Sequence, residues 1–429
     1  MGIKKKLPEK DLTISKPGLK KGRRKFLRNG LLTIAGAGLT SSSLSKCHAD
    51  QGDNREKVKF VYRTLGKTGI RLPIVSMGTG STQSSGLVSA ALDKGVKLLA
   101  TSPYYQNGKN EKMVGSIIKG RHRDSFVVLT SVDLIKWSDT RTGELKPGFD
   151  PKIIIKKVDE SLKRLNVDHI DILVQAFAAT RKSVLSKPIR DAMEAIRKSG
   201  KVKYIGIATH RLEHEAIRAA VDSGKIDVVM TSYNFRRKGW KWKQEGKKLD
   251  DAIRYAAESG MGIIAMKTMA GVYWDKERTQ PINASAALKW VLQNKNIHTI
   301  VPDCTSYDQL DQNLGLMADL NFTEAETRSL EPPSKELVSG LYCQQCNKCI
   351  SQCPASMDIP TIMRSYMYAY GYRNLEHAKD TLSMAGLKSL PCVDCSDCVV
   401  NCSMGFNVKK KILDIGRLTD VPEDLIRYT

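Results

Sequence analysis

The chain has 429 residues, ten of them cysteine, and its 69 Lys and Arg against 45 Asp and Glu give a formal net charge of +24. A hydrophobic content of 41% argues against global disorder. The sequence has no run of 18 apolar residues, so we expect no ordinary membrane-spanning helix. Residues 1–49 hold twelve basic and two acidic residues, which leaves +14 for the rest of the chain. That remainder suits an acidic protein partner or an anionic small molecule, with a solvated basic surface as the plainer alternative. No nucleic-acid-binding motif accompanies the charge, so we expect no nucleic acid partner.

The first 49 residues have the composition of a targeting segment. The basic stretch Gly22–Arg28 contains an Arg-Arg pair, the stretch Gly30–Leu44 is apolar and rich in small residues, and Cys47–Ala49 fits a cleavage site. The segment resembles a twin-arginine signal peptide, which implies export of a folded protein to a periplasmic or extracytoplasmic location. A basic tail with a chance Arg-Arg pair is the alternative, and peripheral membrane association stays open. We expect a linker at 50–59.

Between residues 60 and 325 the chain alternates short apolar runs with amphipathic segments. The apolar runs predict eight strands: Ile74–Met77, Lys97–Thr101, Phe126–Ser131, Ile170–Gln175, Tyr204–Ala208, Val228–Thr231, Gly262–Lys267 and Thr299–Val301. The amphipathic segments predict the helices Pro151–Leu165, Ile189–Ser199, Leu212–Ser223, Lys247–Ser259, Ala284–Gln293 and Tyr307–Ala318. This alternation predicts an α/β fold, a (β/α)8 TIM barrel. A doubly wound open sheet is the alternative, but no G-x-G-x-x-G motif follows an early strand.

Eight cysteines form two runs of the same C-x2-C-x2-C-x3-C spacing: Cys343, Cys346, Cys349 and Cys353, then Cys392, Cys395, Cys398 and Cys402. The spacing is that of bacterial ferredoxins, in which the fourth cysteine of a run binds the other of two [4Fe-4S] clusters. The expected ligand sets are Cys343, Cys346, Cys349 and Cys402 for cluster one, and Cys392, Cys395, Cys398 and Cys353 for cluster two. Zinc and disulfides are weaker alternatives, because zinc ribbons use cysteine pairs and thiols this close together are badly placed for separate bridges.

The 38 residues between Cys353 and Cys392 are too many for a compact ferredoxin hairpin. Their apolar residues at spacings of three and four predict helices at Ile359–Tyr370 and Leu375–Gly386. The segment 341–429, after a linker at 326–340, resembles the helical dicluster ferredoxins of respiratory complexes. The resemblance implies transfer of single electrons, and a purely structural cluster domain is the alternative.

Motifs along the predicted barrel name a second family. The opening Tyr62–Gly69, the pair Ser161–Leu165 and Asp168–Leu173, and the later Ser232–Asn234 follow one another in the order found in aldo-keto reductases. The resemblance implies hydride transfer from a nicotinamide to a carbonyl, with a Tyr as the acid, a Lys and an Asp that lower its pKa, and a His that orients the carbonyl. These groups lie at the carboxyl ends of the barrel strands.

The catalytic positions that the family implies are largely changed. Tyr105 matches the acid and is the one catalytic candidate, while Ala100, Ser131 and Ala176 stand where the Asp, the Lys and the His are expected. With no cation beside Tyr105, the usual lowering of its pKa is absent. We therefore expect the ordinary carbonyl reductase activity to be lost.

The cofactor site that the resemblance implies is partly kept. Tyr233, which would stack on a nicotinamide, Lys267, Gln309 and Asn313 match the family, so NADP binding stays open. Asp303 stands where a glycine approaches the nucleotide phosphates, and a carboxylate there is repulsive. Core packing is the alternative role for Tyr233.

Other chemistry-bearing residues lie in predicted loops. His210 and His214 are four apart and could share a metal ion, but without a third ligand we expect them at the surface. A basic-aromatic loop with Trp240 and Trp242 could cap the barrel mouth, with Gly108–Asn110, Ser131 and Gln175 also shaping a ligand site.

The sequence predicts an exported oxidoreductase with two [4Fe-4S] clusters. Electrons would pass between an unknown small-molecule ligand in the barrel and an external electron-transfer protein or redox complex. The alternatives are a catalytically inactive barrel that serves as a binding or assembly subunit of a redox complex, and a reductase with tightly bound NADP.

Overall fold

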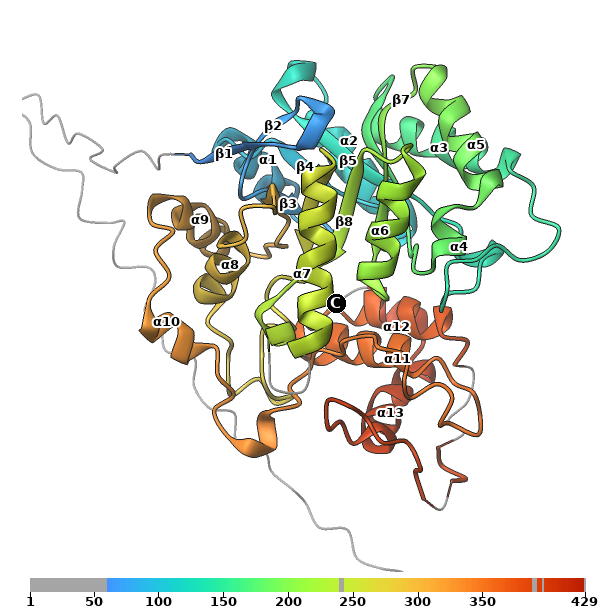
Figure 1. The fold of residues 1–429 in the computed structure, drawn as a ribbon, viewed down its shortest axis with the longest axis vertical. Helices are drawn as coiled ribbons and strands as arrows, with labels where there is room; N and C mark the ends of the chain where they lie inside the picture. Colours follow the sequence, from blue (N-terminus) through green and yellow to red (C-terminus); the bar gives the residue numbers. More distant parts are fainter. Residues whose placement is uncertain (1–59, 239–242, 388–391, 396, 428–429) are drawn as a thin grey trace, which may run out of the picture. The chain divides into compact units, whose positions relative to one another are not determined.

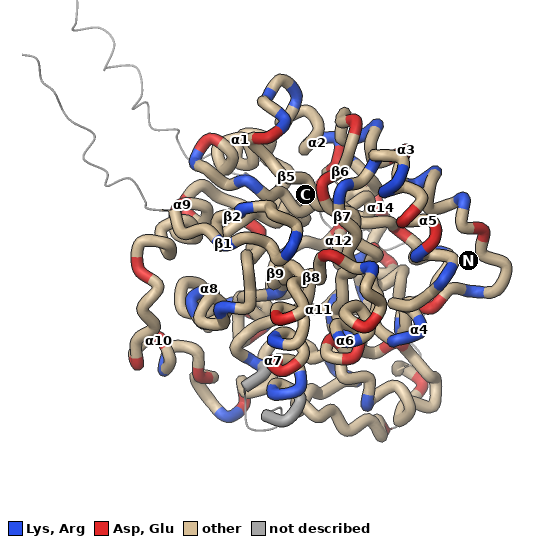
Figure 2. Tube along the Cα trace, turned by 45° about the horizontal axis from the view of Figure 1, so that its top comes forward, with Lys and Arg blue, Asp and Glu red and all other residues tan. Residues whose placement is uncertain are grey.

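The computed structural model describes residues 60–238, 243–387, 392–395 and 397–427. The predicted signal peptide, the linker at 50–59, and Trp240 and Trp242 lie outside these residues. The described residues belong to one compact unit, Lys57–Thr429. None of its described helices combines the length and the apolar character needed to cross a membrane. Figure 2 shows Lys and Arg interspersed with Asp and Glu along the described elements.

Eight parallel strands form the barrel, preceded by an antiparallel hairpin of β1 (Tyr62–Thr64) and β2 (Arg71–Pro73). Each strand pairs with the next along the chain, and bridges between Val75 and Ile300 and between Gly78 and Asp303 join the first edge to the last. The strands are β3 (Met77–Gly78), β4 (Leu98–Ala100), β5 (Val127–Val132), β6 (Ile170–Gln175), β7 (Val202–Thr209), β8 (Val228–Ser232), β9 (Gly262–Met266) and β10 (Thr299–Ile300). The predicted TIM barrel is confirmed, because each predicted strand overlaps one of these.

Helices cover the outside of the strands (Figure 1). They are α1 (Ser85–Asp93), α2 (Lys109–Ile118), α3 (Lys152–Leu165), α4 (Arg181–Val184), α5 (Lys187–Lys198), α6 (Glu213–Ser223), α7 (Lys243–Glu258), α8 (Ala284–Leu292) and α9 (Tyr307–Gly315). One apolar cluster fills the space between strands and helices, and a second, which includes Leu129, Ile172 and Ile264, fills the barrel interior. Because the strands are buried on both faces, they read as continuous apolar runs, which is why the sequence located them.

The segment after the barrel is helical apart from the cysteine runs. Its helices are α10 (Glu324–Ser329), α11 (Ile359–Tyr366), α12 (Leu375–Met384), α13 (Val408–Gly416) and α14 (Glu423–Arg427). The predicted helix Ile359–Tyr370 is α11 continued by a π-helical turn, Met367–Gly371. Figure 1 shows α11 and α12 at one end of the barrel. Single π turns often occur at functional sites.

A buried ion pair attaches α11 to the barrel. Arg211, two residues after the end of β7, donates to both carboxylate oxygens of Asp358 at 2.8 and 3.1 Å. The side chains are 3% and 4% exposed. Asp358 also caps α11, because it accepts a hydrogen bond from the backbone N–H of Thr361. A second pair, Lys276–Asp414 at 2.7 Å, joins the barrel to α13. The ends of the barrel strands thus carry the C-terminal helices directly.

Candidate active site between the barrel and the iron-sulfur domain

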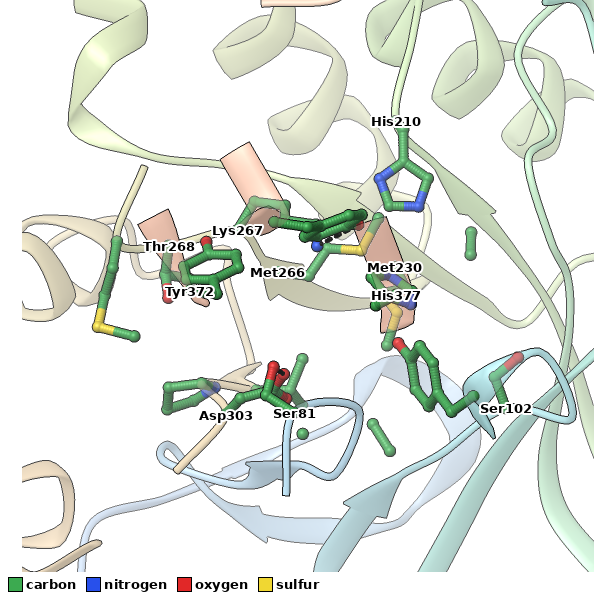
Figure 3. Close-up of a pocket in the computed structure, with 18 of the residues that line it drawn as sticks. Ser81, Ser102, His210, Met230, Met266, Lys267, Thr268, Asp303, Tyr372 and His377 are labelled. Carbon is green, nitrogen blue, oxygen red and sulfur yellow. Dashed lines mark hydrogen bonds between the residues drawn. The ribbon is translucent and has the colours of Figure 1, made fainter. Parts of the chain in front are cut away.

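A cavity of about 300 Å³ lies where the strand ends meet the C-terminal helices. Its barrel side includes Tyr104, Tyr105, Ser131, His210, Lys267 and Asp303. Its other side includes Arg364, Tyr368, Gly371, Tyr372, His377 and Thr381. Figure 3 shows His210, Lys267, Tyr372, Asp303 and His377 placed around one open space. TIM-barrel enzymes keep their active sites at this end, so the cavity is the candidate active site.

Tyr105 follows β4 in a short turn whose next residues, Gln106 and Asn107, have left-handed backbone angles. Its ring lies in the cavity, 5.6 Å from the ring of His377. Burial raises the pKa of Tyr105, and the nearby Asp303 raises it further. The phenol therefore stays protonated.

The neighbours of Tyr105 are small. Ala100, Ser131 and Ala176 line the same cavity, and the Ser131 hydroxyl is 2.7 Å from that of Ser102. These side chains offer no charge to the phenol.

The C-terminal helices bring a second tyrosine into the cavity. Lys267 Nζ donates a hydrogen bond to the Tyr368 hydroxyl at 2.8 Å, across 101 residues of sequence. The His377 ring packs 4.0 Å from the Tyr368 ring. Tyr104 and Thr381 place their hydroxyls 3.3 Å apart. The structure thus assembles a lysine, a tyrosine and an imidazole from separate domains.

The expected surface position of His210 is wrong. Its ring lines the cavity and packs 5.4 Å from the ring of Phe177. Burial lowers the pKa of both His210 and His377, and the positive charges of Arg364 and Lys267 lower them further. Both imidazoles are therefore neutral near pH 7.

Three of the four predicted cofactor residues line the cavity. Lys267 bonds to Tyr368, Gln309 accepts from the backbone N–H of Thr305 at 2.8 Å, and Asn313 donates to Cys304 Sγ at 3.2 Å. Asp303 also lines it and accepts a hydrogen bond of 2.6 Å from Ser81.

Tyr233 lies elsewhere. Its hydroxyl donates to Asp250 on α7 at 2.6 Å, and its ring packs against Trp290 in the outer core. This ring is not among the cavity residues, so its position fits core packing and not stacking on a nicotinamide in the cavity.

Two further expectations about the cavity wall are wrong. Gln175 bonds to the Ser183 carbonyl and to Arg190, on the helix side of the barrel. Asn110 is fully buried and accepts hydrogen bonds from Thr79 and Thr101, behind the cavity. Gln175 ends strand β6, where side chains alternate between the inside and the outside of the barrel, and Asn110 lies on helix α2.

The first predicted cysteine set surrounds a cavity of its own. Cys343, Cys346, Cys349 and Cys402 all line it. Gln344 lines it too, and its buried amide atoms have no hydrogen-bond partner among the described residues. No group of three or more His, Cys, Asp or Glu within the described part is spaced to hold a single metal ion. Four thiolates around a cavity with a spare amide donor fit a [4Fe-4S] cluster, in which each thiolate binds a different iron.

The second set is drawn together in the same crossed manner. Burial raises the pKa of the Cys392 thiol, and Cys395, Cys353 and Cys398 raise it further. Cys353 thus lies near the second run and Cys402 near the first, as the spacing predicts. The described cysteines form no disulfide.

A small cavity joins the first cysteine set to the candidate active site. It is lined by Cys343 and by His210, Lys267 and Arg364, and these last three also line the large cavity. Cys343 is therefore separated from the ligand cavity only by the small cavity and these three side chains.

Sequence reasoning missed Arg364, Tyr368 and His377. The signal available was the unusual length of the segment between the cysteine runs and its tyrosines, Tyr366 to Tyr372. Nothing local in that segment shows that it faces a barrel mouth.

Family comparisons agree with this architecture. Residues 77–286 match the aldo/keto reductase family, and residues 342–407 match a 4Fe-4S dicluster domain. The protein is therefore an aldo-keto reductase family barrel fused to a C-terminal 4Fe-4S dicluster domain, and it is an aldo-keto-reductase-like oxidoreductase by class.

Individual relatives match the barrel portion. The chain is 25% identical over 333 residues to L-galactose dehydrogenase of Arabidopsis thaliana, and this alignment covers 66% of the chain and 99% of the relative. It is 22% identical over 324 residues to an NADH-specific methylglyoxal reductase of Escherichia coli, with 64% and 98% covered. A solved aldo-keto reductase from Bacillus halodurans, in its holo form, shares 20% identity and covers 65% of this chain and 96% of its own, with a TM-score of 0.49.

Proposed function

We propose that this protein is an exported oxidoreductase that passes single electrons between an external carrier and a small molecule bound in the barrel cavity. The observation that carries the proposal is the small cavity that Cys343 shares with His210, Lys267 and Arg364. It puts a thiolate of the inner cysteine set beside side chains that line the ligand cavity. The two family matches support the two halves, a ligand-binding barrel and an electron-transfer domain.

The two cysteine sets would hold two [4Fe-4S] clusters, which supply or accept electrons one at a time when bound. The inner set includes the buried Cys349, whereas Cys395 and Cys398 of the outer set are exposed. Cys392 of the outer set is also buried, so it is the exposed Cys395 and Cys398 that suit exchange with an electron-transfer protein or redox complex. Cys343 of the inner set lines the small cavity beside the ligand site.

The cavity residues can handle protons that accompany the electrons. The Tyr368 oxygen accepts a hydrogen bond from Lys267, so its own proton stays free to be donated toward a ligand. His377, in contact with both Tyr105 and Tyr368, is a neutral imidazole that can pass a proton on. These groups stand in for the acid-base residues that the barrel strands lack.

Ordinary carbonyl reduction by Tyr105 is not part of this proposal. Its pKa is raised and its strand neighbours Ala100, Ser131 and Ala176 carry no charge. Loss of a positioned acid-base system costs about 10²–10⁴-fold in rate.

A reductase with tightly bound NADP is the second candidate. Lys267, Gln309 and Asn313 line the cavity, and one relative is by name an NADH-specific reductase, which supports a nicotinamide nucleotide without favouring NADP over NAD. Asp303 at the cavity wall opposes nucleotide phosphates if it ionises.

The first experiment is anaerobic purification, iron analysis, and mass spectrometry of whatever small molecule the protein releases. We expect about eight iron atoms per chain, from two four-iron clusters. Reduced methyl viologen should then be oxidised in the presence of the released compound, and the Cys346→Ser variant should lose this reaction. NADPH-dependent reduction of methylglyoxal at full rate by Cys346→Ser would overturn the proposal in favour of the second candidate.

Export is tested separately. Replacing Arg23 and Arg24 by Lys should leave the protein in the cytoplasmic fraction of a bacterium with a twin-arginine system. Unchanged export of this variant would remove the twin-arginine part of the proposal.

A further inference from the structure

Arg364 is a buried cation that forms no ion pair with any residue that the structure describes. It lies on α11, is 5% exposed and lines both the large and the small cavity. Among the described residues it makes no ion pair and no side-chain hydrogen bond, and its guanidinium lies over the ring of Phe177, 5.2 Å from the ring centre. Arg211, equally buried, is instead paired with both oxygens of Asp358. A buried guanidinium is stable only when an acceptor compensates its charge.

Lys267 adds a second positive charge to the cavity, where its electrostatic counterpart is the carboxyl of Asp303, whose pKa burial raises and Lys267 lowers in part. Its ammonium bonds to the neutral oxygen of Tyr368, and no Asp or Glu of the described part lies within ion-pair distance. Lys267 has a left-handed backbone, with φ of 57° directly after β9. Such angles in a residue other than glycine cost energy and cluster at ligand sites. Phe177, which contacts Arg364, is also left-handed, with φ of 58°.

The other polar groups of the cavity do not balance these charges. His210 and His377 face the cavity and can donate N–H bonds (Figure 3). Asp303 is the one acidic residue among those that line the cavity, against the cations Arg278, Lys267 and Arg364. Burial raises the pKa of Asp303, while Ser81 and Lys267 lower it. Its carboxyl is bonded to Ser81, and Figure 3 places the two together, away from His210.

We propose that the cavity binds a small organic anion, whose carboxylate or phosphate group is held by Arg364 and Lys267. A guanidinium binds either group with two parallel hydrogen bonds, and the ammonium adds charge. The rings of Tyr104, Tyr105 and Tyr372 would contact the rest of the molecule. This deepens the proposed function by naming the ligand class of the same cavity.

The anion would also lie near the inner cysteine set. Arg364 and Lys267 line the small cavity together with Cys343. A negative group bound there changes the field at the first cluster, so binding should alter that cluster's electron paramagnetic resonance spectrum. This readout does not depend on turnover.

The test is isothermal titration of the anaerobic holoprotein with benzoate, inorganic phosphate and the uncharged benzamide. We expect benzoate or phosphate to bind at least tenfold more tightly than benzamide and to shift the spectrum of the reduced protein. Arg364→Gln should weaken anion binding at least tenfold. Arg373→Gln, which removes the same charge from an exposed residue after the π turn, should bind as the wild type does.

Iron content checks that Arg364→Gln is folded, and Lys267→Gln serves if it is not. Equal affinity for benzoate, phosphate and benzamide, or unchanged anion binding in both variants, would overturn the inference. Two results distinguish this inference from the proposed electron transfer. Cys346→Ser should still bind anions even though it loses the first cluster. If only the ligand class were wrong, the wild type would still oxidise methyl viologen.

Discussion

The two cysteine sets have the same spacing but different surroundings. Cys343 of the inner set shares a cavity with Arg364 and Lys267, whereas Cys395 and Cys398 of the outer set are exposed. The difference comes from the helices between the two runs, because α11 packs on the barrel while the second run lies beyond it. The same cysteine spacing thus occurs once next to the small cavity and once with two cysteines exposed to solvent.

This asymmetry gives the proposed electron path a direction in space. An external carrier can approach the exposed cysteines of the outer set, whereas Cys343 of the inner set lines the small cavity next to the ligand cavity.

The largest effect should come from removing one cluster at a time. Cys346→Ser should lose about half of the iron and abolish viologen oxidation by the cavity ligand, and Cys395→Ser should lose a similar share of iron but keep the spectral response to anions. Iron assays and paramagnetic resonance measure both. Cys304→Ser is the control, because Cys304 is buried outside both sets. Full iron content in Cys346→Ser would contradict the ligand assignment.

The second largest effect should be a loss of stability when the ion pair that attaches α11 to the barrel is broken. Arg211→Ala leaves the buried carboxylate of Asp358 without its partner and should destabilise the protein by about 3–5 kcal/mol. Arg141→Ala, at a half-exposed pair with Asp139, should cost about 0–1 kcal/mol. Thermal unfolding of the holoproteins compares the two. Equal losses would show that the pair does not hold the domains together.

The two cavity tyrosines should differ in function. Tyr368→Phe removes the hydroxyl that bonds to Lys267 and should lower turnover of the cavity ligand by about 10²–10³-fold. Tyr105→Phe should change it by no more than about threefold, because its pKa is raised and no cation bonds to it. Steady-state kinetics decide the matter, and a reversed order would return the catalytic role to Tyr105.

The smallest effect is a pH dependence of stability. Because burial lowers the pKa of His377 in the folded protein, the unfolded chain takes up a proton first as the pH falls below about 6.5. Stability is therefore present above that pH and decreases below it, by up to about 1.4 kcal/mol per pH unit for one imidazole. His377→Gln should lose less stability than wild type between pH 6.5 and 5 in urea titrations. Parallel curves would show that His377 is not held neutral.

Much of the fold was predictable because its signals are local. Strands buried on both faces read as apolar runs, so Ile170–Gln175 was predicted with its observed bounds, and amphipathic stretches such as α3 and α6 were predicted to within a residue or two. Helices α1 and α2 were missed, and α1 is rich in Gly, Ala and Ser and offers little contrast between its faces.

The candidate site was predicted less well. Tyr105, Lys267, Gln309 and Asn313 were placed in the cavity region by resemblance, but Tyr233 and Gln175 point to the outer side of the barrel. A family motif predicts that a residue lies at the end of a strand. It does not predict the direction of the side chain when the neighbouring residues differ from those of the family.

Spacing alone predicted the crossed cysteine sets, because three thiols two residues apart can share one centre while the fourth points to another. The apolar runs alone located the strands, because a strand buried on two faces leaves such a run in the chain, but they left a barrel and an open sheet both possible. Only the tertiary structure decided that Arg364, Tyr368 and His377 face Lys267 and His210. Contacts across 100 or more residues depend on how two domains pack, and no local pattern in the sequence records that.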